Sequence, residues 1–153
     1  MDTDSSSYIL LALDGEPHSD AAIEWSMNLA RALHQPIAAI FVKDPYLKQF
    51  YNEIYAQGRK AYLDHVQACL DSNAKEALTR FEDLAVAQGV EAKCLVRQGS
   101  PAEELRAELT TGNYSMLVLG AKRLNGLKRW RQGKLPAKVV AENPGFPVLV
   151  VPD

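Results

Sequence analysis

The chain has 153 residues, which suits one domain with a sizeable core, and we expect a single domain over residues 1–153 with a flexible stretch at 1–7. Hydrophobic residues make up 47% and charged residues 24% of the chain, a composition that excludes disordered and fibrous proteins. The formal net charge of -2 argues against a protein that coats nucleic acid, because such proteins carry a strong basic excess.

The first predicted unit is a strand, a helix and a second strand. Residues 8–13 form a continuous apolar run before Asp14 and Gly15, which predicts a strand buried on both faces and then a turn. Ser19 can cap the following helix, whose apolar stripe would cover one face of the sheet. The residues of that stripe are Ala22, Trp25, Leu29 and Leu33. Residues 36–42 are a second buried strand.

The middle of the chain has a helical pattern from about residue 47 to residue 88. Capping residues cluster at 71–73 and predict a break, so this segment is one long helix or two collinear helices. Gly89 suits the left-handed position that ends a helix. Residues 90–97 alternate more than the earlier strands, and we therefore expect this strand at a sheet edge. The aromatic-rich segment 46–62 is interpreted as core packing, with a lid or a partner surface as the alternatives.

The last part of the chain contains two more helices and two more strands. A capping box at 100–103 has proline at the first helical position and predicts a helix that ends near residue 112. Residues 116–119 form a buried strand that runs directly into a glycine. A short helix at 136–142 ends at an Asn-Pro-Gly sequence, and residues 148–151 form the last strand.

Strands that alternate with helices predict an α/β fold, namely a doubly wound five-stranded parallel sheet with helices on both faces. Ligands of such sheets bind beyond the carboxyl ends of the strands, at the point where the strand order reverses. The sequence brings the following residues to this edge: Asp14-Gly15, Val42-Lys43-Asp44, Gly99-Ser100 and the segment after Gly120. A ligand site is therefore expected there.

The sequence also argues against a membrane span, an export signal and a metal site. The apolar runs are strand-sized, shorter than the roughly 20 residues of a membrane-spanning helix, and residues 1–7 resemble no export signal. We therefore expect a cytoplasmic protein. Cys69 and Cys94 form no CxxC spacing, and we expect no histidine at i,i+4 from another ligand type. We therefore predict that both cysteines are reduced thiols in the core and that the protein has no metal site.

Three segments resemble the universal stress protein family. They are Leu13-Asp14-Gly15, the Gly-Ser-Pro-Ala-Glu-Glu sequence at 99–104, and Pro147 with the Val-Leu-Val-Val sequence after it. The resemblance extends from Tyr8 to Val151 and implies the adenine nucleotide alpha hydrolase-like fold, with strand order 3-2-1-4-5. It also implies a role in the stress response and a homodimer that pairs through the last strand, Val148, Leu149, Val150 and Val151.

The resemblance includes a phosphate loop that is altered at two positions. Nucleotide-binding members of the family have a glycine, two residues, a glycine, nine residues, a glycine and then serine or threonine. Aligned on Gly120 and Gly133, this sequence has Arg123 for the middle glycine and Lys134 for the hydroxyl residue. Gly126 is the candidate to replace the missing glycine. Glycines let backbone amides approach phosphate oxygens, and the Lys134 ammonium can pair with a phosphate as a point charge.

The resemblance also implies that the Asp14 carboxylate contacts the nucleotide and that the Val42 backbone contacts its base. The ligand would be ATP or AMP, with Mg²⁺ if ATP binds. Each residue also has a structural interpretation: Asp14 can cap the amides of a turn, and the Val42 side chain can simply be core.

Seven basic residues gather in and after the loop: Lys122, Arg123, Lys128, Arg129, Arg131, Lys134 and Lys138. The patch is either a solvated loop or a binding site for a nucleotide or another phosphate ligand, while nucleic acid is the least favoured partner.

Two functions remain open on the sequence. The first is a regulatory module that binds a phosphate ligand, and the second is a nucleotide-independent homodimer that acts through protein contacts. Catalysis is not expected, because the sequence has no catalytic triad or nucleophile elbow and its glycine loop lacks the Gly-Lys-Ser/Thr ending of a motor ATPase. Any turnover of bound ATP would be slow.

Overall fold

The computed structural model describes five stretches of the chain: 7–13, 19–44, 59–121, 134–143 and 145–152. Four of the candidate site residues lie outside the described residues, namely Asp14, Arg123, Gly126 and Gly133. Most of the aromatic-rich segment lies outside them too, although its last residue, Tyr62, is buried as expected. Within the described residues, no helix combines the length and the apolarity that crossing a membrane requires.

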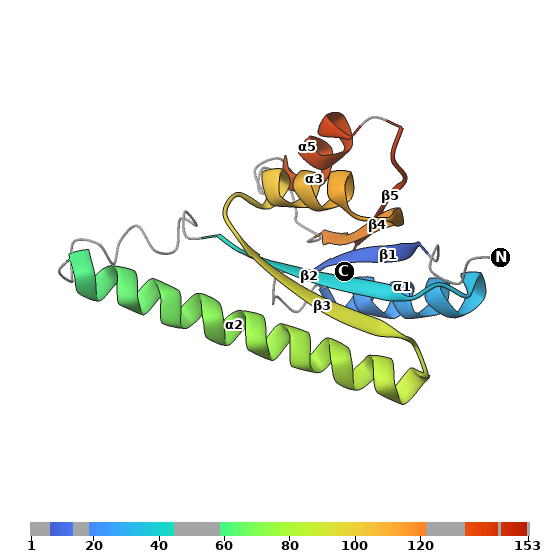
Figure 1. Ribbon diagram of the computed structural model, residues 1–153, viewed down its shortest axis with the longest axis horizontal. Helices are drawn as coiled ribbons and strands as arrows, with labels where there is room; N and C mark the ends of the chain where they lie inside the picture. The colour runs from blue at the N-terminus through green and yellow to red at the C-terminus, as the bar shows by residue number, and fades with distance from the viewer. Residues whose placement is uncertain (1–6, 14–18, 45–58, 122–133, 144, 153) are drawn as a thin grey trace.

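Strands and helices alternate along the chain, as the sequence predicts (Figure 1). In chain order the elements are β1 (Tyr8–Leu13), α1 (Ser19–Leu33), β2 (Ile37–Lys43), α2 (Arg59–Gln88), β3 (Ala92–Gln98), α3 (Pro101–Thr111), β4 (Tyr114–Ala121), α5 (Lys134–Glu142) and β5 (Val148–Pro152). The five strands form one parallel sheet in the order β3-β2-β1-β4-β5. The expected α/β fold and its strand order are therefore confirmed.

Helices cover both faces of the sheet, since successive side chains of a strand point to opposite faces. The odd-numbered residues of β1, Ile9, Leu11 and Leu13, pack with α1 and α2. Leu10 of β1 packs instead with residues of α3 and α5. Figure 1 shows this division, with α1 and α2 on one side of the sheet and α3 and α5 on the other. Because both faces are buried, β1 is apolar at nearly every position.

The buried face of α1 differs from the stripe that the sequence predicts. Ala22 is buried as expected, and Leu29 is partly buried against the core, but Trp25 is 54% exposed and Leu33 is 47% exposed. The helix instead turns another set of residues to the sheet, namely Ile23, Ser26, Met27 and Ala30. The polar Ser26 is accommodated because its hydroxyl donates a hydrogen bond of 2.8 Å to the carbonyl oxygen of Ala22.

Helix α2 is one continuous helix of 30 residues, so the break predicted at 71–73 is wrong. Its buried stripe continues across that position through Leu70 and Ala74, while the polar residues between them lie on the exposed face. Asp71 does not cap a second helix, because its carboxylate accepts hydrogen bonds from Lys43 and Gln67. Gly89 follows the helix with φ +67° and confirms the expected left-handed end.

The outer strands of the sheet are β3 and β5. The expected edge position of the 90–97 strand is confirmed, and Val96 in this strand is 48% exposed. The start of α3 departs from the sequence prediction in one respect. Ser100 occupies the N-cap position before Pro101, but its side chain makes no capping hydrogen bond. The capping box is therefore incomplete.

Candidate functional site at the carboxyl edge of the sheet

The carboxyl ends of β1, β2 and β4 meet at one edge of the sheet. In the strand register, Leu13 pairs with Phe41 and Ala12 pairs with Leu119. Val42 follows Phe41 in β2, and Gly120 follows Leu119 in β4. The two residues therefore lie on either side of the end of β1. Neighbouring strands are about 4.8 Å apart, which separates these two backbones by about 10 Å across β1.

The strand order reverses at this edge, because β2 lies on one side of β1 and β4 on the other. In doubly wound sheets, ligands bind beyond the strand ends at such a point of reversal. Among the candidate residues, the structure therefore brings Val42 and Gly120 to the same edge. Val42 is half-buried, and its side chain packs against the core on the α3 and α5 face.

Gly99 shapes the turn beside this edge. Its backbone N–H donates a hydrogen bond of 2.9 Å to the carbonyl oxygen of Lys43, the residue after Val42. Its φ of +144° is one that residues with a side chain rarely adopt, and a Cβ atom here would lie 2.9 Å from Glu104 Oε1. Glycine is therefore needed at this position for backbone geometry alone.

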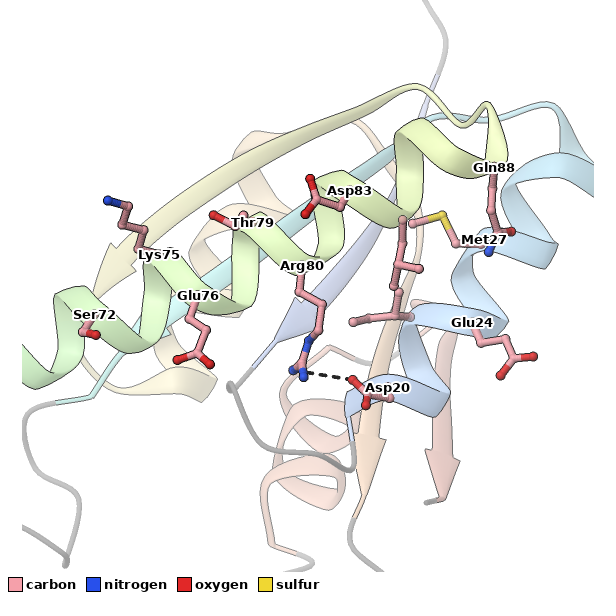
Figure 2. A pocket seen from close by; sticks show the side chains of 12 residues that line it. Asp20, Glu24, Met27, Ser72, Lys75, Glu76, Thr79, Arg80, Asp83 and Gln88 are labelled. Carbon is pink, nitrogen blue, oxygen red and sulfur yellow. Dashed lines mark ion pairs between the residues drawn. The ribbon is translucent and has the colours of Figure 1, made fainter.

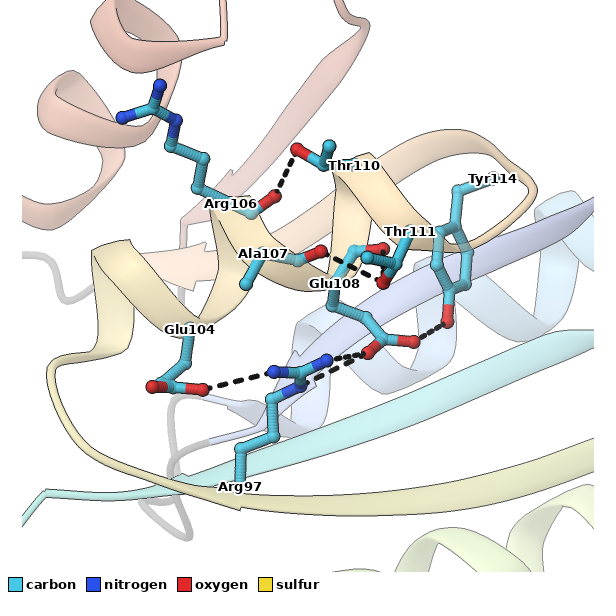
Figure 3. Close-up of polar contacts among 8 residues, drawn as sticks. All are labelled: Arg97, Glu104, Arg106, Ala107, Glu108, Thr110, Thr111 and Tyr114. Carbon is cyan, nitrogen blue, oxygen red and sulfur yellow. Dashed lines mark hydrogen bonds and ion pairs between the residues drawn. The ribbon is translucent and has the colours of Figure 1, made fainter.

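An ion-pair network fixes the α3 side of that turn (Figure 3). Arg97 Nη1 lies 3.2 Å from Glu104 Oε2, and Arg97 Nη2 lies 2.7 Å from Glu108 Oε2. The Tyr114 hydroxyl donates a hydrogen bond of 2.5 Å to the other oxygen of Glu108. The network joins β3, α3 and the start of β4, and Gly99 and Ser100 lie in the connection that it spans.

The network shifts the pKa values of its members. Burial raises the pKa of the Glu108 carboxyl, but hydrogen bonds from Tyr114 and Arg97 outweigh burial and hold that pKa below its usual range. Burial, followed by the hydrogen bond to Glu108, raises the pKa of the Tyr114 hydroxyl. Glu108 is therefore ionised and Tyr114 neutral at neutral pH, and Arg97 compensates the buried negative charge.

Lys43, the last residue of β2, is held on the α2 side of the sheet by an ion pair. Its Nζ lies 2.5 Å from Asp71 Oδ1 on α2, and the Lys43 side chain is only 18% exposed. The hydrogen bond from Lys43, and then that from Gln67, lower the pKa of the Asp71 carboxyl. Lys43 follows the odd-numbered residues of β2 toward α2, whereas Val42 faces α3. The lysine therefore serves the fold and contributes no free charge to the Val42 side.

Helix α5 begins at Lys134, so this candidate residue occupies the first turn of a helix. The first amides of a helix have no partner within it, and they favour an anion. A cation in the first turn opposes the helix dipole unless an anion compensates it. The helix is anchored on the α3 face of the sheet by Val139, which is fully buried.

The structure gives two findings on the cysteines, namely a contact between His65 and Cys69 and the partial exposure of both thiols. His65 and Cys69 both lie in α2, and their Nε2 and Sγ atoms are 3.7 Å apart. The expectation that no histidine lies at i,i+4 from another ligand type is therefore wrong, because the continuous helix aligns these two residues. Within the described residues, no group of three or more His, Cys, Asp and Glu side chains is arranged to hold a metal ion. Both cysteines are free and half-buried.

Sequence reasoning missed Arg97 and Glu108 as residues that support this edge, and it placed Lys43 at the edge without its partner Asp71. Their charges look like an ordinary solvated surface in the sequence. One available signal is position, because Lys43 and Arg97 both stand at the end of strands that approach the edge.

Comparison with known sequences relates nearly the whole chain to one family. A sequence model of the universal stress protein family matches residues 7–152. Universal stress protein YxiE of Bacillus subtilis (strain 168) is 24% identical over 160 residues, which cover 94% of this chain and 97% of YxiE. Universal stress protein MJ0531 of Methanocaldococcus jannaschii is 27% identical over 143 residues, which cover 94% of this chain and 80% of MJ0531.

Solved structures share the fold at lower sequence identity. Hypothetical protein MJ0577 superposes with a TM-score of 0.74 at 18% identity, covering 97% of each chain. A universal stress protein in complex with cAMP has a TM-score of 0.61 at 21% identity, covering 96% of this chain and 97% of that one. Arabidopsis thaliana At3g01520 with AMP bound has a TM-score of 0.65 at 16% identity, covering 95% and 91%. The chain belongs to the universal stress protein family.

Proposed function

We propose that this protein is a regulatory module of the stress response that binds an adenine nucleotide or a related phosphate ligand at the carboxyl edge of its sheet. The observation that carries the proposal is the position of Val42 and Gly120 on either side of the end of β1, where the strand order reverses. Relatives with the same fold hold AMP and cAMP.

The altered loop modifies the expected mode of binding. Arg123 and Lys134 replace a glycine and a hydroxyl residue of the family motif, so two cations stand where the motif has neutral groups. Backbone amides at Gly120, Gly126 and Gly133 are the proposed contacts with phosphate oxygens. Lys134 has no hydroxyl for a hydrated metal ion, and we expect phosphate charge to be compensated more by the protein than by Mg²⁺. Asp14 is the proposed nucleotide contact at the end of β1.

Calorimetric titration tests the proposal with ATP and AMP, each with and without Mg²⁺. We expect binding that survives removal of Mg²⁺ and disappears in the double variant Gly133→Asp, Lys134→Ala. Lys75→Ala is the control, because Lys75 is an exposed cation on α2, which lies on the opposite face of the sheet from α5. The absence of heat at millimolar ligand would refute nucleotide binding, and unchanged affinity of the double variant would move the site elsewhere.

The second candidate is a nucleotide-independent homodimer that acts through protein contacts. The observation that favours it is the edge position of β5, where Val150 is 36% exposed. An apolar edge strand offers unpaired backbone groups to a second chain. Light scattering at micromolar concentration should detect a dimer that Val150→Lys disrupts. The control Val140→Lys, at a residue of α5 that is 50% exposed, should leave the dimer intact. A monomeric wild-type protein would contradict this candidate.

Regulation rather than catalysis is part of the proposal. If ATP binds, release of phosphate should be slow, and a turnover number above about 1 per second, typical of enzymes, would contradict a regulatory role. The cytoplasmic location stays a prediction from the sequence.

A further inference from the structure

The two halves of α2 pack differently. The second half lies on the sheet beside α1 (Figure 2). In the first half, Tyr62, Val66 and Leu70 form a separate buried cluster, and Figure 1 shows these first turns extending past the strands. Cys69 packs against this cluster and is half-buried. Part of Cys69 is therefore open to solvent, outside the core that covers the sheet.

An imidazole lies beside the Cys69 thiol. Cys69 Sγ is 3.7 Å from Nε2 of His65, which is exposed and lies one turn earlier on α2. The contact exists because α2 is continuous, and residues four apart on a helix share a face. In the tautomer that carries its proton on Nδ1, the imidazole accepts the thiol proton at Nε2. A thiol with this neighbour can react as the thiolate, which is the nucleophilic form of cysteine.

The neighbours of Cys69 along α2 do not oppose a thiolate. Apart from His65, the residues one turn away in either direction are uncharged, namely Val66, Ser72 and Asn73. Asp64 is five residues before Cys69 and lies about 140° around the helix from it. The charge of Asp71 is compensated, because its Oδ1 is 2.5 Å from Nζ of Lys43 at the end of β2.

The charges on the second half of α2 lie further away. Lys75, which is labelled in Figure 2, follows Cys69 by six residues, or about 9 Å along the helix axis. Beyond it, Arg80 Nη2 lies 3.5 Å from Asp20 Oδ1 of α1. Among the described residues, the imidazole of His65 is therefore the titratable group in contact with this thiol.

Cys94, the other cysteine of the chain, has opposite surroundings. Burial, and then the hydrogen bond and the charge of Glu82 on α2, raise the pKa of the Cys94 thiol to about 12. A carboxylate opposes the formation of a neighbouring thiolate, whereas an imidazole can hold the proton that the thiol releases. The two thiols should therefore differ in reactivity, and Cys94 serves as an internal reference for Cys69.

We propose that Cys69 is a redox modification site at which the thiol exchanges with a low-molecular-weight disulfide. The Sγ proton passes to His65 Nε2, and the thiolate attacks one sulfur of the disulfide. A bond forms between Sγ and that sulfur as the S–S bond of the disulfide breaks. The other half leaves as a thiolate and takes the proton from the imidazolium. Cys69 is thereby oxidised to a mixed disulfide, and the disulfide, which is the oxidant, is reduced to one free thiol.

The test uses the full chain with Cys94→Ser, in which Cys69 is the one remaining thiol. Glutathione disulfide is the probe, and mass spectrometry of the intact protein follows the adduct with time. At pH 7 we expect added His65→Gln to slow the reaction at least about fivefold, because glutamine can hydrogen-bond but cannot take up the proton. At pH 9.5 an ordinary thiol, with a pKa of about 8.5, ionises without help, and the two rates should agree within about twofold.

Two controls accompany this comparison. His34→Asn removes another exposed histidine, at a position with φ +53° that asparagine tolerates, and it should change the rate by no more than about twofold. Cys69→Ser leaves Cys94 as the one thiol, and this chain should form the adduct at least about tenfold more slowly than the chain that keeps Cys69. Because His65 is exposed, the circular dichroism of His65→Gln should match that of the wild type.

Three results would overturn the proposal. The first is a Cys69 thiol that reacts no faster with glutathione disulfide than the Cys94 thiol. The second is an unchanged rate for His65→Gln at pH 7. The third is an equal loss of rate for His65→Gln at pH 7 and pH 9.5, which would mean that His65 only shapes the surroundings of the thiol and takes no proton from it.

Discussion

Replacement of Arg97 by methionine removes the guanidinium that joins β3 to α3 while it keeps most of the apolar stem. In the native protein, Arg97 Nε and Nη2 lie 3.1 and 2.7 Å from Glu108 Oε2. Arg97 Nη1 lies 3.2 Å from Glu104 Oε2. After the substitution, Glu108 keeps the hydrogen bond from Tyr114 but loses its cation.

The exposure of each partner sets the expected loss of stability. The Glu104 side chain is 27% exposed and solvent screens its pair, so that pair is worth about 0.5 kcal/mol. The Glu108 side chain is only 13% exposed, and loss of a charged hydrogen-bonding partner at such a site costs about 2 kcal/mol. We therefore expect Arg97→Met to lower the free energy of unfolding by about 2–3 kcal/mol at pH 7.

Urea unfolding monitored by circular dichroism measures this difference, with Arg106→Met as the matched control. Arg106 lies on the same helix, is exposed, and points away from the network in Figure 3. The control should change stability by less than about 0.5 kcal/mol. A loss for Arg97→Met that equals the loss for Arg106→Met would refute the assignment of a structural role to this network.

The same pair of proteins gives a pH dependence whose sign follows from Glu108. Its pKa is lowered in the folded state, so folding favours the ionised carboxylate, and the resulting stability is present above the unfolded pKa of about 4.3. That stability is lost as the pH falls through the lower folded pKa. The stability difference between wild type and Arg97→Met should therefore shrink between about pH 5 and pH 3, and a difference that grows on acidification would contradict this assignment.

Three further substitutions test the core, a turn and a thiol. Phe81→Ala removes a fully buried side chain and should lower the free energy of unfolding by about 3–5 kcal/mol, whereas Val86→Ala, at a residue that is 83% exposed, should change it by less than about 0.5 kcal/mol. Gly99→Ala introduces a Cβ at φ +144° and should lower the free energy of unfolding in urea by about 1–3 kcal/mol. A variant as stable as the wild type would show that the turn relaxes freely. Burial, and then Glu82, raise the pKa of the Cys94 thiol to about 12, so in a Cys69→Ser background its alkylation by iodoacetamide at pH 8.5 should be at least about 100-fold slower than that of free cysteine. Alkylation at the free-cysteine rate would contradict burial of this thiol.

The sequence by itself determined the order and type of the elements. Continuous apolar runs predict β1, β2 and β4 because strands buried on both faces leave no polar position. Gly89 marks the end of α2, since a left-handed residue there favours glycine. Family resemblance supplied the strand order, which periodicity alone does not contain. Together they place Val42 and Gly120 at one edge, because parallel strands all present their carboxyl ends on the same side.

The tertiary structure decided which faces are buried and which charges meet. Trp25 belongs to an apolar stripe in the sequence yet is exposed, because the orientation of α1 depends on where the helix lies over the sheet. Polar residues at 71–73 suggest a break, but they lie on the outer face of a helix whose inner face stays packed. Arg97 and Glu108 come together across a turn. Such features depend on contacts between elements that local sequence patterns do not encode.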